Sequence, residues 1–314
     1  MNKKNAFFIK SRFVLIDAFA LIFRAYYALP PLTNKEGAQL NAVYGFTSAL
    51  LAAIKELEPE YLAVGFDLPK PTKRHIEYVK YKAHRAPMPE DLMAQVPYVR
   101  EILKAMNIPV FAVEGYEGED VIATIVANVK AQMSNVKTMP LGMQFIIVTG
   151  DLDCLQLVDS QTKVYSMARG VNQAVMYDEA KVRERYGLSP KQFVDFKALK
   201  GDASDNIPGV SGIGEKGAAK LVAEFGNLEK IYENLEKLSE NLQKILKEGK
   251  DQAFLSQKLS KIVDDVPLEF NLVDAKIHDY NQRKIIKLFE KYGFRSLIKR
   301  LPESSRKDSQ QKLL

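Results

Sequence analysis

The most constraining feature of the sequence is a short apolar run that ends in two carboxylates. Residues 145–149 read Phe-Ile-Ile-Val-Thr, and Gly150 then turns the chain before Asp151 and Asp153. A run this short predicts a strand buried on both faces of a parallel sheet. Ligands bind at the carboxyl ends of such strands, where an Asp-x-Asp pair offers oxygen atoms to a divalent cation. The alternative is a turn followed by a helix N-cap, since Asp is common in both.

The same arrangement recurs along the chain, which favours the metal hypothesis. Further strands are predicted at residues 13–17, 61–67 and 108–113, and each ends at or leads to an acidic residue. Helices are predicted at 18–29, 41–57, 90–106, 121–133, 178–186 and 190–199, and two short strands at 162–177 around Ala168-Arg169-Gly170. This alternation predicts an α/β fold with a mostly parallel sheet, followed by a predominantly helical region to about residue 300.

Nine acidic residues follow a predicted strand or precede a predicted helix: Asp17, Asp67, Glu117, Glu119, Asp120, Asp151, Asp153, Asp202 and Asp205. So many carboxylates in one cleft would repel one another and raise each other's pKa values, unless divalent cations bind there. The chain has only 3 His residues and none lies in these clusters. Oxygen ligands without His indicate Mg²⁺ or Mn²⁺ rather than Zn²⁺. For Glu119 and Asp120, the alternative is that they complement a helix N-terminus.

Two further segments suit nucleic acid. Residues 69–89 interleave Lys, Arg and Tyr between prolines, a composition that fits either a solvated loop or a single strand with stacked bases. Residues 208–221 read Pro-Gly-Val-Ser-Gly-Ile-Gly-Glu-Lys-Gly-Ala-Ala-Lys-Leu, which is typical of a helix-hairpin-helix. Its glycines would let the backbone approach a phosphate, with a plain helix connector as the alternative.

Composition sets wider limits on the protein. The formal net charge is +6, which is compatible with nucleic-acid binding but is weak support by itself. One Cys excludes an internal disulfide framework and fits a reducing cytosol. No apolar run is long enough to cross a membrane, and no phosphate-binding Gly-x-x-x-x-Gly-Lys-Ser/Thr loop is present.

Together these motifs resemble the 5′-nuclease family, most closely the 5′–3′ exonuclease domain at the start of bacterial DNA polymerases I. The matching stretches occur in family order between residue 13 and about residue 226: 15–17, 41–46, 66–67, 74–75, 81–85, 115–120, 149–153, 201–209 and 212–216. The resemblance implies a resolvase-like (PIN-like) nuclease core, a helical arch near residues 69–90 and a helix-hairpin-helix region. The expected division is 1–200 for the core, 201–300 for the helical DNA-binding region and 301–314 for a linker-like tail.

The resemblance also implies a structure-specific 5′–3′ exonuclease and 5′-flap endonuclease. Its two-metal phosphodiester hydrolysis would give 5′-phosphate and 3′-hydroxyl ends. The first metal's side would be lined by Asp17, Asp67, Glu117, Glu119 and Asp120, and the second's by Asp151, Asp153, Asp202 and Asp205. Lys82 and Arg85 would be catalytic together with Asp17 and Asp67. DNA contacts are implied for Arg24, Arg74, Tyr81, Gly212, Gly214, Lys216 and Lys220.

The expected cofactors are two or more Mg²⁺ ions, with Mn²⁺ as a substitute, and K⁺ at the hairpin. The expected partner is DNA with a 5′ flap, a nick or an RNA primer in replication and repair. The chain is expected to be either a stand-alone nuclease or a fragment, and a fragment would be joined to a C-terminal polymerase domain. A monomer in the bacterial cytoplasm, near the nucleoid and without membrane contact, is expected. Glu119 departs from the usual bacterial motif by carrying a longer side chain, and residues 130–144 form an extension. A haloacid-dehalogenase-like phosphatase fits the motif order poorly, whereas a non-catalytic DNA-structure-binding member of the family remains the alternative.

Overall fold

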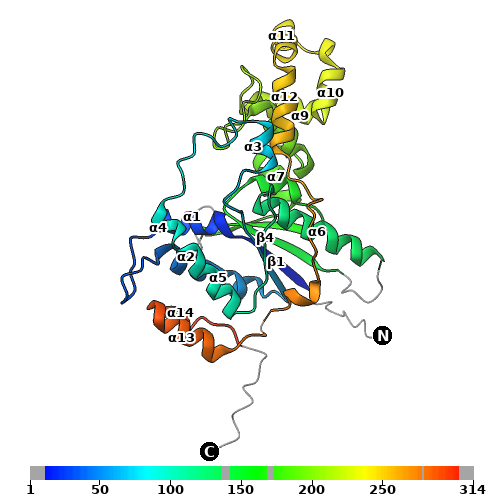
Figure 1. Cartoon of the computed structure of the whole chain (residues 1–314). Coiled ribbons are helices and arrows are strands. Elements are labelled where there is room, and N and C mark those ends of the chain that lie inside the picture. The colour runs from blue at the N-terminus through cyan, green and yellow to red at the C-terminus, as the bar shows by residue number, and fades with distance from the viewer. Residues whose placement is uncertain (1–10, 136–141, 168–172, 278, 304–314) are drawn as a thin grey trace, which may run out of the picture.

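The fold is a six-stranded sheet between two layers of helices, with a helical extension at one end (Figure 1). The computed structural model describes residues 11–135, 142–167, 173–277 and 279–303. Within them the strand order is β3-β2-β1-β4-β5-β6, and all neighbours are parallel except β5 and β6. The strands are β1 (Arg12–Asp17), β2 (Tyr61–Gly65), β3 (Val110–Phe111), β4 (Gln144–Thr149), β5 (Thr162–Ser166) and β6 (Val175–Tyr177).

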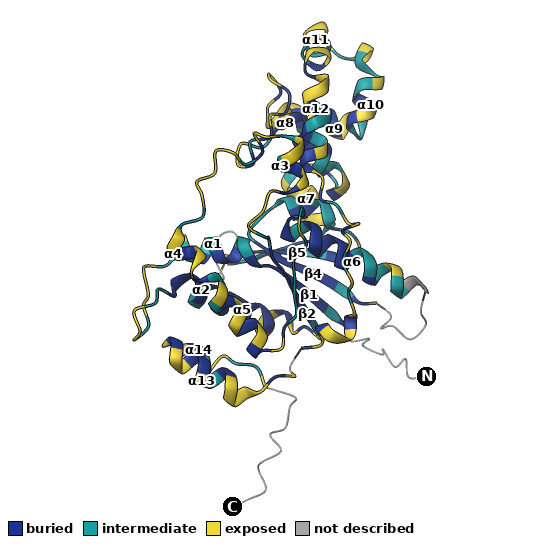
Figure 2. Ribbon diagram, in the orientation of Figure 1, coloured by how far each residue is buried: buried dark blue, intermediate teal, exposed yellow. Residues whose placement is uncertain are grey.

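The central strands are buried on both faces, as their apolar sequences predict (Figure 2). Side chains alternate between the faces of a strand, so Val14 and Ile16 of β1 enter one core, whereas Phe13 and Leu15 enter the other. β4 divides its apolar residues between the same two cores. The prediction of a doubly buried strand before Asp151 is therefore confirmed.

Helices from successive parts of the chain cover the two faces. The first core contains α1 (Ala18–Ala28), α2 (Asn41–Leu57) and α5 (Val96–Ala105), while the second contains α6 (Gly118–Asn135) and α8 (Phe193–Lys200). α7 (Glu179–Tyr186) follows β6. α3 (Lys73–Glu77) lies within residues 69–89, here called the basic-aromatic segment, and α4 (Glu90–Met93) directly follows that segment. Short 3₁₀ turns are η1 (Asp153–Leu157), η3 (Pro190–Gln192), η4 (Leu235–Lys237) and η5 (Leu272–Ala275).

After α8 the chain leaves the sheet and later returns to it (Figure 1). The helical extension contains α9 (Glu215–Phe225), α10 (Leu228–Glu233), α11 (Glu240–Glu248) and α12 (Lys250–Ser260). α13 (Gln282–Tyr292) and α14 (Arg295–Ile298) then pack beneath α2 and α5. No helix in the described residues is long and apolar enough to cross a membrane.

Prolines account for two differences from the predicted elements. The helix predicted at 90–106 is divided into α4 and α5, because Pro97 lies in the first turn of α5 and has no N–H to continue an earlier helix. The strand predicted at 108–113 is reduced to the two residues of β3, directly after Pro109. The predicted turn at 168–170 and part of the 130–144 extension lie outside the described residues.

Strand order brings the predicted acidic positions to one place. β1 lies between β2 and β4. The chain first adds β2 and β3 on one side of β1, and then adds β4, β5 and β6 on the other side. The carboxyl ends of strands on either side of such a reversal form a crevice where ligands bind in open α/β sheets. Asp17 at the end of β1 and Asp151 just after β4 therefore face the same crevice.

Candidate active site

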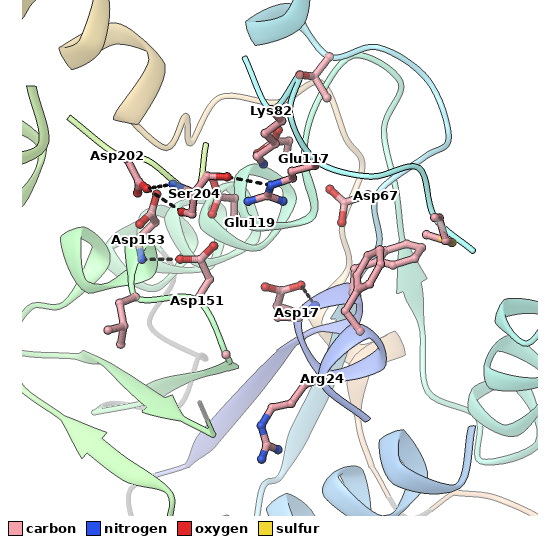
Figure 3. A pocket seen from close by; sticks show the side chains of 18 of the residues that line it. Asp17, Arg24, Asp67, Lys82, Glu117, Glu119, Asp151, Asp153, Asp202 and Ser204 are labelled. Atoms are coloured by element: carbon pink, nitrogen blue, oxygen red, sulfur yellow. Dashed lines mark hydrogen bonds and ion pairs between the residues drawn. The ribbon is translucent and has the colours of Figure 1, made fainter. Parts of the chain in front are cut away.

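A cavity of about 1240 Å³ opens at the carboxyl ends of the parallel strands. Seven of the nine predicted carboxylates line it: Asp17, Asp67, Glu117, Glu119, Asp151, Asp153 and Asp202 (Figure 3). The predicted basic residues Arg24, Lys82 and Arg85 line it too. Figure 3 shows the guanidinium of Arg24 on α1 pointing away from the carboxylates.

Asp17 joins the end of β1 to the start of α1. Its Oδ1 accepts a hydrogen bond of 3.2 Å from the backbone N–H of Ala20, which caps the helix. Its Oδ2 accepts one of 2.8 Å from the hydroxyl of Thr149, at the end of β4. Burial and the nearby Asp67 raise the pKa of Asp17 to about 7, against these hydrogen bonds. Burial and a neighbouring carboxylate thus favour the neutral form of this carboxyl group.

Close backbone contact holds Asp67 against the start of α6. A Cβ added at Gly65 would lie 2.7 Å from the carbonyl oxygen of Gly118, so only glycine fits at the end of β2. The carboxylate of Asp67 accepts a hydrogen bond of 3.0 Å from the Gly118 N–H. Burial is the main cause that raises the pKa of Asp67. The sequence therefore needs small residues here to bring two acidic segments together.

Glu117 and Glu119 enter the cavity at the start of α6. The Nζ of Lys82 lies 2.9 Å from the Glu117 carboxylate, which also accepts a hydrogen bond of 3.3 Å from the Tyr81 hydroxyl. Burial would raise the pKa of Glu117, but Lys82 and Arg74 outweigh it and lower that pKa. Burial raises the pKa of Glu119 well above its usual value, although Arg74 opposes the shift. The pKa values of these two glutamates are thus shifted in opposite directions, although the residues are only two positions apart.

Lys197 of α8 bridges two of the acidic side chains, and the sequence alone did not identify it. Its ammonium contacts Asp153 and lies 2.5 Å from the Asp202 carboxylate, and its side chain is only 5% exposed. Burial and the nearby Asp151 raise the pKa of Asp153 to about 7. Lys197 opposes this shift, but its single positive charge does not outweigh burial and the neighbouring carboxylate. Burial acts in the same sense on Asp202, yet Lys197 and hydrogen bonds from Ser204 lower its pKa to about 2.

Asp120 and Arg74 lie outside the cavity lining and bind each other. The guanidinium donates two hydrogen bonds of 2.8 Å to the carboxylate of Asp120. It also donates to the carbonyl oxygens of Leu259 (3.0 Å) and Lys261 (2.8 Å), at the end of α12. Backbone N–H groups of Glu117 and Val263 complete the contacts of Asp120. The pair thus links the start of α6 to the end of α12, while the roles of Asp120 as metal ligand and Arg74 as DNA contact stay predictions.

The basic-aromatic segment is fastened to the turn at 202–207. The backbone N–H of Lys82 donates to the carbonyl of Asp205 (2.9 Å), and Lys82 adopts a left-handed backbone with φ of 54°. Arg85 pairs with the Asp205 carboxylate and donates to the carbonyl of Ser204 (3.1 Å). Tyr81 is 2% exposed and donates to Asp205 (3.2 Å). Tyr81 and Asp205 are both buried and are not part of the cavity lining, and their roles in DNA contact and metal binding stay predictions.

The Gly-rich hairpin, residues 208–221, includes the first turns of α9. Gly212 has φ of +89°, and open space surrounds the Cβ position of Gly214, so the backbone is accessible there. Lys216 and Lys220 are both exposed on α9. Gly209 has a different role, since an added Cβ would lie 2.3 Å from the backbone nitrogen of Gly201. The residues predicted to contact DNA thus lie on the surface of the helical extension. Gly209 instead allows the chain to pass close to the backbone of Gly201.

The donor atoms of the cavity suit a hard divalent cation, since they are carboxylate oxygens. Burial first, and neighbouring carboxylates second, raise the pKa values of Asp17, Asp67 and Glu119, and a bound cation would favour the ionised form of each. Within the described residues, however, no three His, Cys, Asp or Glu side chains are grouped to hold one ion. Lys82 and Lys197 occupy the positions between carboxylates instead. His75, which sequence analysis did not select, lines the cavity and bonds to Thr72.

Two family profiles match adjacent parts of the chain. The profile described as 5′-3′ exonuclease, N-terminal resolvase-like domain, matches residues 12–187. The profile described as 5′-3′ exonuclease, C-terminal SAM fold, matches residues 188–283. Together they include the whole cavity and the Gly-rich hairpin.

Similar proteins include DNA polymerase I from two bacteria. That of Caldicellulosiruptor bescii is 42% identical over 292 residues, which is 92% of this chain and 33% of that protein. That of Bacillus subtilis is 37% identical over 306 residues, which is 97% of this chain and 34% of that protein. The chain thus spans about a third of the length of these relatives.

Solved structures share the fold at low sequence identity. The T5 D15 protein co-crystallised with metal ions has a TM-score of 0.67 at 19% identity, over 90% of this chain and 99% of that chain. The catalytic core of Rad2 in complex with DNA has a TM-score of 0.57 at 18% identity, over 91% and 89% of the two chains. The predicted fold class, a mostly parallel sheet with a helical C-terminal region, is confirmed.

Proposed function

The chain belongs to the 5′–3′ exonuclease family, and from that premise we propose that it is a metal-dependent nuclease acting on DNA. The membership confirms the resemblance found in the motifs. We propose both 5′–3′ exonuclease and 5′-flap endonuclease action, at flaps, nicks and RNA primers. The observation that carries the proposal is the cavity that seven carboxylates line beside Lys82 and Arg85.

The carboxylates of the cavity are the proposed metal ligands, in two groups. Asp17, Asp67, Glu117 and Glu119 come from β1, β2 and α6, whereas Asp151, Asp153 and Asp202 come from the β4 end and the turn after α8. Bound Mg²⁺ or Mn²⁺ would supply polarisation of the phosphate and activation of water. The side chains themselves would fix the ions and exclude softer metals, since they offer only oxygen.

Lys82 and Arg85 are the proposed phosphate-binding residues of the reaction. Both line the cavity and come from the basic-aromatic segment above it. A cation placed next to a phosphodiester stabilises the negative charge that develops during hydrolysis. Both side chains now contact carboxylates, Glu117 and Asp205, so a phosphate would compete with these acidic partners.

The wider setting is proposed from the relatives. Rad2 was solved with a DNA substrate, and the T5 D15 flap endonuclease with DNA and metal ions. By analogy the Gly-rich hairpin, with Lys216, Lys220 and K⁺, would grip a duplex backbone. We further propose a role in primer removal and repair in the bacterial cytoplasm, as a monomeric nuclease unit followed by a polymerase domain.

A DNA-structure-binding protein without catalysis is the second candidate. The favouring observation is that, within the described residues, no carboxylate trio is arranged around one ion position. Lys82 and Lys197 instead neutralise the carboxylates internally.

The two candidates are separated by cleavage of a 5′-flap duplex labelled at its 5′ end, with Mg²⁺ or with chelator. The wild type should release short labelled fragments only with Mg²⁺, and Asp151→Asn should bind the flap but not cleave it. Asp251→Asn, an exposed carboxylate on α12, is the matched control and should cleave normally. Binding without cleavage by all three proteins would overturn the nuclease proposal and leave the binding protein.

A further inference from the structure

The C-terminal helices α13 and α14 carry an unusual share of the positive charge. Residues 282–300 contain seven Lys or Arg residues and one acidic residue, Glu290, for a net charge of +6. The whole chain also has a formal net charge of +6, so the remaining residues are neutral in sum. All seven basic residues are exposed: Arg283, Lys284, Lys287, Lys291, Arg295, Lys299 and Arg300. We call this surface the α13–α14 basic face.

The face has a fixed orientation because the opposite side of α13 is buried. Lys284, Lys287 and Lys291 recur every three or four residues and therefore share one side of the helix. The other side packs into the first core through Ile285, Leu288, Phe289 and Tyr292. The basic side chains are thus held toward solvent by a packed helix, and they are not part of a loose tail.

Hydrogen bonds also fasten this segment to α2 and α5. The Arg300 guanidinium donates to the hydroxyl (2.8 Å) and the carbonyl oxygen (2.7 Å) of Ser48. The hydroxyl of Tyr44 lies 3.1 Å from that of Ser296, and Tyr292 donates to Glu101. The face therefore has a defined position relative to the rest of the molecule.

Three lysines on this face differ from the lysines elsewhere in the described residues that form ion pairs. In the described residues Lys284, Lys287 and Lys291 form no ion pair, whereas Lys181 on α7 pairs with Glu184 at 2.8 Å. Like charges three and four residues apart on a helix repel each other. A bound polyanion would remove that repulsion. A lipid surface fits less well, because membrane-lying helices also expose apolar side chains, and none of the exposed large apolar residues in the described chain lies at 282–300.

The basic face is separate from the cavity and from the Gly-rich hairpin. Val96, Pro97 and Arg100 of α5 line the cavity, while Tyr98 and Glu101 of the same helix contact Tyr292 of α13. α5 therefore lies between the two surfaces, and the helical extension lies at the opposite end of the molecule (Figure 1). The matched family profiles end at residue 283, before most of this segment.

We propose that the α13–α14 basic face binds the sugar-phosphate backbone of a nucleic-acid duplex, as a second contact besides the hairpin. The proposal deepens the proposed function and rests on it for the nature of the polyanion. Lysine contacts to phosphates are independent of sequence and weaken as salt rises, because binding releases condensed counterions. Each phosphate contact contributes about 0.9 to the slope of log K against log salt concentration.

The test measures binding of the full chain to a blunt DNA duplex by fluorescence anisotropy, in chelator, at several salt concentrations. The variant Lys284→Ala/Lys287→Ala/Lys291→Ala should reduce the slope by about 2 to 3 and weaken binding at least about tenfold near 0.1 M salt. The control Lys35→Ala/Lys181→Ala/Lys237→Ala removes the same charge from three separate, exposed places. It should change both quantities much less.

The outcomes separate this proposal from the proposed function. An unchanged slope and affinity in the face variant, with a normal thermal melt, would overturn the second contact whether or not the wild type cleaves flaps. Equal losses in the face variant and the scattered control would overturn it too, because only total charge would then matter. A wild type that binds duplex through this face but never cleaves with Mg²⁺ would support the face and refute the nuclease.

Discussion

Replacing Lys197 by Met tests whether the cavity is held together by its own cations. The side chain is 5% exposed and bridges Asp153 and Asp202, and Met keeps much of its length and apolar stem. Removing one partner of a buried ion pair costs about 3 to 5 kcal/mol, because the other charge stays buried without compensation. Asp202 is partly accessible to water, so we expect a loss near the lower limit, about 3 kcal/mol.

The measurement is chemical and thermal unfolding in chelator near pH 8, for the wild type and Lys197→Met. For a chain of 314 residues, a loss of that size should lower the midpoint temperature by about 4 to 5 °C. Lys181→Met is the control, because its pair with Glu184 is exposed and is worth about 0 to 1 kcal/mol. Mg²⁺ should stabilise the variant more than the wild type, since a bound cation restores the lost positive charge. A variant as stable as the wild type without metal would refute the reasoning.

Three further predictions follow from the same structure. Asp17→Asn should stabilise the metal-free protein above about pH 8 by up to about 4 kcal/mol and much less near pH 4. The pKa of Asp17 is about 7 in the folded protein and 3.8 ordinarily, so the wild type loses stability as the pH rises from about 4 to about 7 and the buried carboxyl group ionises. The free energy of unfolding of both proteins, measured across this pH range, tests the prediction. Arg74→Lys should lower the free energy of unfolding by about 3 kcal/mol, because an ammonium does not reproduce the bidentate carboxylate contact and both carbonyl contacts; an unchanged unfolding curve would argue against a cross-link. Gly209→Ala should destabilise strongly, since φ is +63° and the new Cβ would meet the backbone of Gly201 at 2.3 Å, whereas Gly214→Ala, in open space, should melt like the wild type while duplex binding is tested separately.

Elements with a regular local pattern were predictable from the sequence. The helix expected at 41–57 is α2 with the same bounds, because its apolar residues recur at helical spacing. β4 was predicted because five apolar or β-branched residues precede Gly150. Helix ends next to proline were less predictable, since Pro97 interrupts a pattern that otherwise continues. Local chemistry thus predicted the elements better than their limits.

The candidate site was predicted in composition but not in its contacts. Strand order brings Asp17 and Asp151 to one cavity, as carboxyl ends of neighbouring strands require. The pairing of Arg74 with Asp120 joins residues 46 positions apart, and no sequence pattern shows that α12 supplies two carbonyls to the same guanidinium. Lys197 was missed for a similar reason, because its spacing on a predicted helix does not reveal that this helix faces Asp153.

The changes in the free energy of unfolding caused by Asp17→Asn and Lys197→Met show whether electrostatics or packing determines the stability of this cavity. If packing decides, both Asp17→Asn and Lys197→Met disturb buried side chains, and both should destabilise the metal-free protein. If charge decides, removing a carboxylate relieves repulsion while removing a lysine increases it, so the free energy of unfolding should rise in one variant and fall in the other. Burial, together with neighbouring carboxylates, raises the pKa of both Asp17 and Asp153 to about 7, so ionisation at either position is unfavourable, as the second account requires. The carboxylates that repel one another in the cavity would then also give it affinity for a divalent cation.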